Sequence, residues 1–305
     1  MTPPDDFDPP IGIPEDLEPG LRRIVAPNPS PMTYRGTNTY LLGDSDIAVI
    51  DPGPNNGDHL QAILSAIQPG QHVSHIMVTH AHLDHSPLAA ALKQETGAEI
   101  YAFGPATAGR STIMQTLAQS GAIGGGEGVD EAFQPDHSVK HGTHISAPSW
   151  SVEALHTPGH IGNHISFAWK NRCFTADHVM GWASSLVSPP DGDLTDFMMS
   201  CALLQSRQWS VFYPGHGAPI ETPNQRLDWL VSHRQSREAQ ILNALSQGPK
   251  TAAMIAQDIY TETPPALLGA ATRNVLAHLV DLTVKKIAAP AGPLCVDAVF
   301  GLCDD

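Results

Sequence analysis

The sequence is poor in positive charge. Lys and Arg number 16 against 31 Asp and Glu, which gives a formal net charge of −15 at pH 7. Such a surface repels polyanions at long range, because nucleic-acid affinity comes largely from contacts between cations and phosphates. Aromatic residues, which stack on the bases of single strands, make up only 6% of the chain. The composition therefore disfavours general nucleic-acid binding, while leaving room for a local basic patch.

Cysteine is also rare. The four cysteines are Cys173, Cys201, Cys295 and Cys303, and none forms a C-x-x-C pair. A chain of 305 residues buries enough apolar surface to fold without disulfides. We therefore expect free thiols in a reducing compartment.

The distribution of charged and apolar residues predicts neither a targeting segment nor a membrane span. The stretch MTPPDDFDPP at the N-terminus has neither the positive region nor the apolar region of a signal peptide. No apolar run approaches the roughly 18 residues of a membrane-spanning helix. We expect a cytoplasmic protein without membrane contact, in which residues 1–18 form a flexible arm.

A change of character after Pro223 indicates a second domain. Residues 224–247 have the pattern of one long helix, and Gly248-Pro249 ends it. A chain of this length is expected to form one large domain and one small one. We predict a catalytic domain over 19–248, which includes the long linker helix, and a small domain over 249–305.

The small domain has the element order of a winged helix. Helical patterns cover Thr251–Tyr260 and Ala266–Lys286, with a break at Pro264-Pro265 between them. A strand-like tail follows and ends at Leu302. We therefore expect a winged-helix-like domain.

The catalytic domain alternates strand and helix patterns in both halves, with a strand-rich middle. This alternation predicts an α/β fold, and two mixed sheets covered by helices would make a four-layer αβ/βα sandwich. The expected helices are His59–Ile67, Asp84–Thr96 and Asp193–Gln208, with a less clear one at Ile113–Leu117. The expected strands are Leu21–Ala26, Thr39–Leu42, Ile47–Ile50, His75–Thr79, Ala98–Phe103, Ser151–His156, Ile165–Trp169, Arg172–Ala176 and Val211–Tyr213.

A dense run of metal-ligating residue types follows an apolar strand pattern. His80 and His82 are two residues apart, so in extended geometry both side chains point to one side. Asp84 and His85 follow at the expected start of a helix, whose dipole favours a carboxylate. Imidazole and carboxylate are ligands that zinc and similar divalent ions prefer.

Three more candidates stand at strand ends beside turn residues. They are His160 in Thr-Pro-Gly-His, Asp177 after Phe-Thr-Ala, and His216 in Pro-Gly-His-Gly. Glycine allows the backbone to approach a crowded centre closely. A lone histidine is more often a satisfied polar residue than a ligand, but seven such residues in this order predict a metal centre.

These motifs resemble those of the metallo-β-lactamase superfamily. The stretches PMTYRGTNTYL at 31–41 and SHRQSREAQIL at 232–242, together with the winged-helix tail, are similar to its β-lactamase-like-protein-2 branch. The resemblance covers nearly the whole chain from about Leu21. It is specific for the fold and the metal centre, and weak for the substrate.

The resemblance also implies how two metal ions share the ligands. The implied ions are zinc, with manganese or iron as alternatives. Two such ions about 3.5–4 Å apart share a water and lower its pKa towards ~7, so that a bridging hydroxide attacks the substrate. Asp84 is expected to be the catalytic residue that orients this nucleophile. One ion is assigned His80, His82 and His160, the other is assigned Asp84, His85 and His216, and Asp177 bridges them.

Other residues are candidates for roles around the ions. Asp51 is expected to orient the ligand loop from behind, or to be a plain turn residue. His164 is expected to support the ligands rather than bind a metal. His178 either lines the substrate pocket or faces the core, and Asn38 is a candidate for substrate contact. Ser86-Pro87 replaces the Gly-Gly that the family usually has, and proline is tolerated in a first helical turn.

Three functions are compatible with the sequence. The first, which the acidic charge favours, is hydrolysis of a small ester, thioester or lactone. The second, which the resemblance implies, is phosphodiester cleavage of single-stranded RNA. The third is a nucleic-acid- or protein-binding module built on the winged helix, whose few cations favour instead a packing, lid or homodimer role. Antibiotic hydrolysis is disfavoured, because superfamily β-lactamases typically carry Cys at the position of Asp177.

Overall fold

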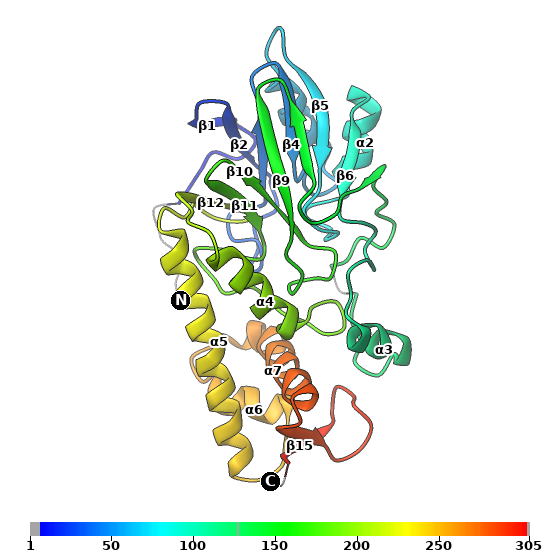
Figure 1. Ribbon diagram of the computed structural model, residues 1–305, viewed down its shortest axis with the longest axis vertical. Helices are drawn as coiled ribbons and strands as arrows, with labels where there is room; N and C mark the ends of the chain where they lie inside the picture. Colours follow the sequence, from blue (N-terminus) through cyan, green and yellow to red (C-terminus); the bar gives the residue numbers. More distant parts are fainter. Residues whose placement is uncertain (1–6, 127, 304–305) are drawn as a thin grey trace.

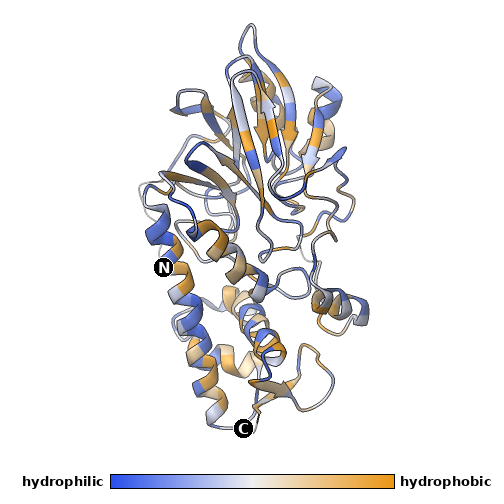
Figure 2. Ribbon diagram, viewed as in Figure 1, coloured by the Kyte–Doolittle hydropathy of each residue, from blue (hydrophilic) through white to orange (hydrophobic). Residues whose placement is uncertain are grey.

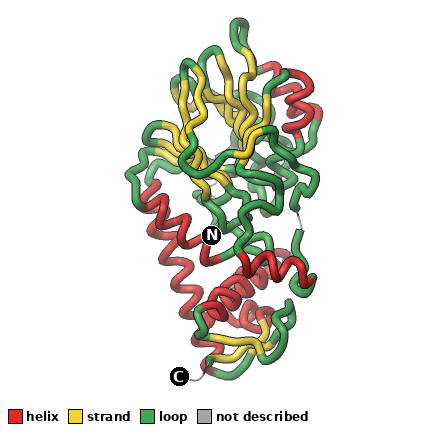
Figure 3. The backbone as a smooth tube through the Cα atoms, turned by 45° about the vertical axis from the view of Figure 1, so that its right-hand side comes forward, coloured by secondary structure: helices red, strands yellow, loops and turns green. Residues whose placement is uncertain are grey.

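The computed structural model describes residues 7–126 and 128–303. Strands gather in one half of an elongated molecule, and the helices of the last third of the chain lie below them (Figures 1 and 3). A small sheet lies at the far end of this helical part (Figure 3). The strands of the two larger sheets and the helices of the C-terminal third thus occupy different ends of the molecule.

The first sheet follows the chain order, because each strand pairs with the next one. Pairing is antiparallel from β1 to β4 and parallel from β4 to β7. Its seven strands are β1 (Glu15–Glu18), β2 (Leu21–Val25), β3 (Asn38–Leu42), β4 (Asp46–Ile50), β5 (His72–Met77), β6 (Glu99–Ala102) and β7 (His137–Ser138).

The second sheet has the order β12-β11-β10-β9-β8 and is antiparallel except between β11 and β12. Its strands are β8 (His144–Ala147), β9 (Trp150–His156), β10 (Ile165–Trp169), β11 (Arg172–Ala176) and β12 (Val211–Pro214). The inner faces of the two sheets share one hydrophobic core. Tyr40 from the first sheet packs on Phe174 and Tyr213 from the second, at ring-centroid distances of 5.2 and 5.7 Å.

Helices cover the outer faces of both sheets. The helices α1 (Gly57–Ser65) and α2 (Leu88–Thr96) bury Ile63 and Leu92 against the first sheet. On the second sheet, α4 (Leu194–Gln205) and α5 (Pro223–Ser246) bury Phe197 and Leu230. The four-layer αβ/βα sandwich predicted from the alternation of elements is confirmed.

The C-terminal region packs around a separate core, to which α5 contributes its last turns and α3 (Thr112–Ser120) contributes Met114 and Leu117. Hydrophilic and hydrophobic residues alternate along α5 (Figure 2), as expected of a helix that buries one side only. Within the described residues, no helix combines the length and apolarity of a membrane span. The remaining elements are β13 (Lys250–Thr251), α6 (Ala252–Ile259), the 3₁₀ helix η1 (Pro265–Leu267), α7 (Leu268–Val284), β14 (Ala288–Pro290) and β15 (Val299–Leu302).

The helix expected from Asp84 begins later, at Leu88. The preceding residues are held by other loops: the Leu83 N–H donates to the Gly128 carbonyl, and the Gly53 N–H donates to the His85 carbonyl. These long-range bonds keep the ligand loop out of the helix. The prediction that the dipole of this helix acts on Asp84 as a first-turn residue was wrong.

The prediction of a flexible arm over residues 1–18 was also wrong for the part of it that the structure describes, residues 7–18. Strand β1 lies within it and pairs with β2, and Glu15 forms an ion pair with Arg23 at 2.6 Å. Phe7 is buried, with the Arg23 guanidinium 4.7 Å from its ring centre. Residues 1–6 lie outside the described part of the chain.

Candidate metal centre

The seven predicted ligands meet at one edge of the sandwich, where strands of both sheets end. His80, His82, Asp84 and His85 follow β5, and His160 lies between β9 and β10. Asp177 follows β11 and His216 follows β12, which is parallel to β11. Since parallel neighbours end at the same edge, the topology brings the last two side chains together.

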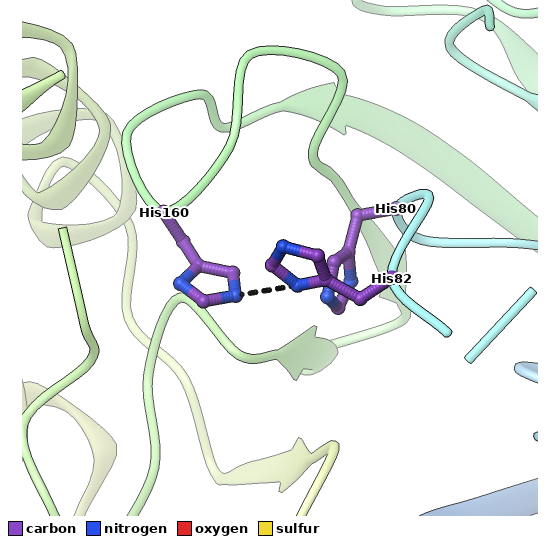
Figure 4. A group of neighbouring side chains, drawn as sticks. All are labelled: His80, His82 and His160. Carbon is purple, nitrogen blue, oxygen red and sulfur yellow. Dashed lines mark hydrogen bonds between the residues drawn. The ribbon is translucent and has the colours of Figure 1, made fainter. Parts of the chain in front are cut away.

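Three imidazoles form the first group of ligands. Ring nitrogens of His80, His82 and His160 all lie within 4.8 Å of one another. His160 Nε2 is 3.0 Å from His82 Nδ1 (Figure 4). The group is the one that the family resemblance assigns to the first ion.

Two imidazoles and a carboxylate form the second group. Asp84 Oδ2 is 3.1 Å from His216 Nε2 and 3.3 Å from His85 Nε2. Thr37 Oγ1 donates a long hydrogen bond of 3.4 Å to the same carboxylate oxygen. The Asp84 side chain is 26% exposed, whereas those of His85 and His216 are buried. Asp84 is therefore the member of this group that solvent reaches.

Asp177 lies between the two groups. Its Oδ1 is 3.4 Å from His85 Nε2, and its Oδ2 is 3.4 Å from His216 Nε2. The same Oδ2 is 3.6 Å from His160 Nε2, in the first group. One carboxylate thus reaches ligands on both sides, which is the arrangement that a bridging ligand requires.

Three buried ligand atoms in this centre make no hydrogen bond. They are His80 Nε2, His85 Nε2 and Asp177 Oδ1. A buried polar atom without a hydrogen bond is costly, and metal ions bound by the two groups would satisfy all three atoms. Three ring nitrogens on one side, and two ring nitrogens with a carboxylate on the other, are a donor set that suits zinc and similar divalent ions. The residues present therefore fit the metal centre that the sequence predicts.

The two groups differ in their electrostatics. Burial lowers the pKa of the His82 imidazole to about 3, so that this ring is neutral. Burial also opposes positive charge on His216 and His85, but the carboxylates of Asp177 and Asp84 outweigh it. They raise the pKa of His216 to about 9 and that of His85 well above its usual range. A metal ion that binds the second group displaces those protons.

Asp51 supports the ligand loop from the side away from the centre. Its carboxylate accepts hydrogen bonds from the Thr79 N–H at 2.8 Å and the Thr79 hydroxyl at 2.7 Å. It also lies 3.0 Å from His85 Nδ1, which leaves His85 Nε2 for the centre. Of the two alternatives, the geometry favours the orienting role over the plain turn residue.

The other candidates lie behind the ligands. His164 is buried, with Nδ1 2.9 Å from Thr157 Oγ1 and its ring 5.1 Å from that of His80. His178 faces the core: its ring is 4.5 Å from Phe197, and its Nε2 is 3.6 Å from Cys201 Sγ. Both rings are therefore buried behind the candidate ligands, and neither lines the described pocket.

Asn38 does not offer its side chain to a substrate. The residue is fully buried, and its amide donates to the carbonyls of Pro214 and Gly217, each at 2.9 Å. The main-chain N–H of Asn38 also donates to the Gly215 carbonyl at 2.7 Å. The expected substrate contact is replaced by a clamp on the loop that carries His216.

Ser86, which with Pro87 replaces the usual Gly-Gly of the family, makes hydrogen bonds within the ligand loop. Its hydroxyl lies 3.1 Å from the His82 carbonyl and 2.8 Å from Asp130 Oδ2. Pro87 directly precedes the first residue of α2. The pair therefore closes the ligand loop without disturbing the ligands.

Some residues that support the centre carry no signal in the sequence. The Leu186 carbonyl lies 2.7 Å from His160 Nδ1, and the Ser185 hydroxyl donates to the carbonyl of Asp177. Ser185 is in turn held by Arg234, which belongs to the 232–242 stretch, although nothing in that stretch identifies its partner. These contacts join distant segments, so neither periodicity nor spacing could have indicated them.

Comparison with known families agrees with this geometry. A model of the metallo-beta-lactamase superfamily matches residues 32–240, and one of the beta-lactamase associated winged helix domain matches residues 251–286. A beta-lactamase-like protein 2 homolog from Caenorhabditis elegans is 27% identical over 295 residues, covering 93% of this chain and 87% of the relative. The Drosophila melanogaster homolog is 29% identical, covering 85% and 86%. The resemblance found in the sequence is confirmed.

Further relatives and solved structures extend the comparison. An atrochrysone carboxyl ACP thioesterase from Aspergillus fumigatus is 32% identical over 237 residues, covering 75% of this chain and 66% of the relative. A beta-lactamase domain protein from Burkholderia ambifaria is 20% identical with a TM-score of 0.80, covering 99% and 97%. A metallo-beta-lactamase family protein from Thermus thermophilus is 23% identical with a TM-score of 0.75, covering 94% of this chain and 100% of that protein. The two structures show the same fold over 99% and 94% of this chain.

Proposed function

The chain belongs to the metallo-beta-lactamase superfamily, and we propose that it is a two-metal hydrolase of small esters, thioesters or lactones. The observation that carries the proposal is the position of Asp177, whose carboxylate reaches ligands of both groups. Two ions held in this way would supply Lewis acidity and an activated water at neutral pH. Zinc is the proposed metal.

The candidate residues would have different roles around the ions. His80, His82 and His160 would hold one ion, and His85, His216 and Asp84 the other. Asp84 is the ligand of the second group that faces solvent, so its carboxylate is placed to orient a water and to take up its proton. Asp51 and Asn38 keep the ligand loops in place.

A pocket next to the ligand loops favours the proposal that the substrate is small. Its volume is about 390 Å³, and its walls include Tyr34, Trp182 and Ile220. This volume falls in the range of small-molecule sites. Trp182 belongs to the segment that follows Asp177, and Ala218, Pro219 and Ile220 of the loop after His216 also line the pocket. The pocket thus lies where the chain leaves two of the ligands.

The charge of this pocket suits an uncharged acyl group better than a polyanion. Its lining cation, Arg226, donates to the carbonyls of Met180 and Ala183, each at 2.7 Å. The guanidinium is therefore engaged with the main chain, while Glu221 adds negative charge to the lining. The net charge of −15 acts in the same direction at long range. The thioesterase name of the fungal relative supports the same substrate class.

The metal content of the purified protein is the first expected result. We expect about two equivalents of transition metal per chain, mainly zinc, because two groups of buried ligands share one carboxylate. Elemental analysis of protein purified without chelator measures this directly. Metal content near zero after supplementation would exclude the proposal, and a single equivalent would exclude its two-metal form.

Substrate class is tested by a parallel activity panel. We expect kcat/KM for thioesters and lactones to exceed that for a fluorogenic single-stranded RNA at neutral pH, because the described pocket holds no unengaged cation. The Trp182→Ala variant should raise KM for acyl substrates more than it lowers kcat, since the side chain lines the pocket without touching the ligands.

A ligand variant shows whether each activity belongs to this centre. Any activity of the protein should disappear in His82→Ala, whose missing imidazole belongs to the first group. Metal-dependent RNA cleavage that is lost in His82→Ala, without acyl hydrolysis in the parent protein, would reassign the protein as a nuclease.

A further inference from the structure

The segment from Ser185 to Pro189 touches the metal ligands from behind. The Ser185 hydroxyl donates to the carbonyls of Asp177 and His178, and so fixes the turn that follows β11. The Leu186 carbonyl lies 2.7 Å from His160 Nδ1. Since a carbonyl can only accept, Nδ1 must carry the proton, and His160 Nε2 is left free to face the centre.

Helices α5 and α7 hold this segment at two consecutive peptide groups, on either side of the Leu186 Cα atom. Arg234 from α5 donates to the Ser185 carbonyl, and Asn274 Oδ1 from α7 accepts from the Val187 N–H at 3.1 Å. The same Asn274 oxygen accepts from Arg234 at 3.0 Å, which joins the two contacts. The residue between them is Leu186, whose carbonyl sets the tautomer of His160. The peptide that orients a predicted ligand is therefore held by α5 on one side and by α7 of the C-terminal region on the other.

A second cation, this one from α7, extends the same contact. Arg273 donates to the Ser188 hydroxyl at 2.8 Å and to the carbonyl of Pro189. Both Arg273 and Asn274 lie in the part of the chain that matches the winged helix domain. This domain thus reaches the metal-bearing loops through two adjacent side chains.

The burial of Arg234 indicates that the contact is specific. The residue is 2% exposed and forms no ion pair within the described residues. Its partners are the Ser185 carbonyl, the Asn274 amide oxygen and the ring of Phe197, 4.9 Å from the guanidinium carbon. A buried guanidinium without a carboxylate is costly, so a hydrophobic residue would serve simple packing better.

The remaining cations of the C-terminal domain are mostly engaged as well. Lys250 pairs with Asp258 at 2.5 Å, and Lys285 pairs with Asp281 at 2.6 Å. With Arg273 directed inward, the domain has little positive charge left for phosphate contacts. Its contacts point towards the metal centre rather than towards a nucleic acid.

We infer that the C-terminal domain is a positioning part of the metal centre, and that Asn274 is the positioning residue through which it acts on His160 and Asp177. This assigns the winged helix a role in metal affinity and ligand geometry. The inference needs the metal centre but not the acyl substrate class.

Cobalt binding to the full-length, metal-depleted protein tests this role. We expect Asn274→Ala to bind Co²⁺ about 10–100-fold more weakly in at least one site, as is typical when a supporting partner of a metal ligand is lost. The visible absorption of the bound cobalt should change as well, because the ligand geometry changes. Asn274→Asp should restore both readouts, since both contacts of Asn274 are accepted by Oδ1.

A matched control separates positioning from general damage to α7. Thr272→Ala removes a hydroxyl whose hydrogen bond to the Leu268 carbonyl stays within the helix, and should leave cobalt binding unchanged. Wild-type affinity and spectrum in folded Asn274→Ala would overturn the inference. If that variant does not fold, Ser188→Ala, which removes only the hydroxyl bound to Arg273, should still weaken binding, and unchanged binding there would overturn it equally.

Discussion

Replacing Asp177 by Asn is expected to remove at least one of the two metal ions and to lower kcat/KM about a thousandfold, which corresponds to several kcal/mol of lost stabilisation of the transition state. The substitution keeps the shape of the side chain and removes its charge. The carboxylate oxygens lie within 3.6 Å of His85, His160 and His216, so the substitution removes the one negative charge that reaches both groups of candidate ligands among the described contacts.

Two controls make this result specific for the shared ligand. Asp281→Asn changes another buried carboxylate, which accepts from Thr195 and pairs with Lys285, and it should keep both metal ions and the activity. His164→Asn keeps an amide that can reach Thr157, and it should keep both ions with a smaller loss of activity. Equal metal loss in Asp177→Asn and His164→Asn would show that the division into ligands and supporting residues is wrong.

The architecture was predictable because its determinants are local. Alternating apolar runs bounded by turn residues indicated the strands, and the spacing of Leu60, Ile63, Leu64 and Ile67 indicated α1. The start of α2 was missed because long-range bonds hold residues 80–87, and no local signal reveals that Gly128 accepts from Leu83. Element type thus followed from periodicity, whereas this boundary depends on a partner far along the chain.

The seven candidate ligands, which the structure brings together, could be picked out from residue type and position alone. Histidine and aspartate at strand ends beside turns were a sufficient signal, because a crowded centre needs donors on short loops. Their division between two ions came from the family resemblance, and the distances around Asp177 agree with that division. Asn38 was misplaced because its partners, the carbonyls of Pro214 and Gly217, are distant in sequence.

Glycine at position 215 marks where the main chain comes closest to the ligands. A Cβ atom there would lie 2.4 Å from Asp177 Oδ1 and 2.8 Å from His85 Cε1, well inside normal contact distances. The φ angle of Gly215 is not in the left-handed region, so an alanine would meet no backbone strain of its own. The sharpest conflict is therefore with the side chains of the two candidate ligands, and the Ala176 carbonyl carbon at 3.3 Å leaves the new methyl group little room to move away from them.

Gly215→Ala should consequently have the effect of replacing a metal ligand, although all seven candidate ligands stay in the sequence. We expect metal affinity to fall and kcat/KM to drop about a hundredfold, as displacement of a reacting group by about 1 Å typically causes. Overpacking should also cost about 1–3 kcal/mol of unfolding free energy.

Gly269→Ala in α7, where a Cβ would meet nothing within 4 Å, should keep metal content and activity and gain slightly in stability, since alanine favours a helix. Metal titration, steady-state kinetics and denaturant unfolding of the two variants measure these effects. Full metal occupancy and normal kcat/KM in Gly215→Ala would mean that the loop carrying His216 relaxes freely, and that Asn38 and Tyr40, whose side chains hold the Pro214 carbonyl, do not fix it.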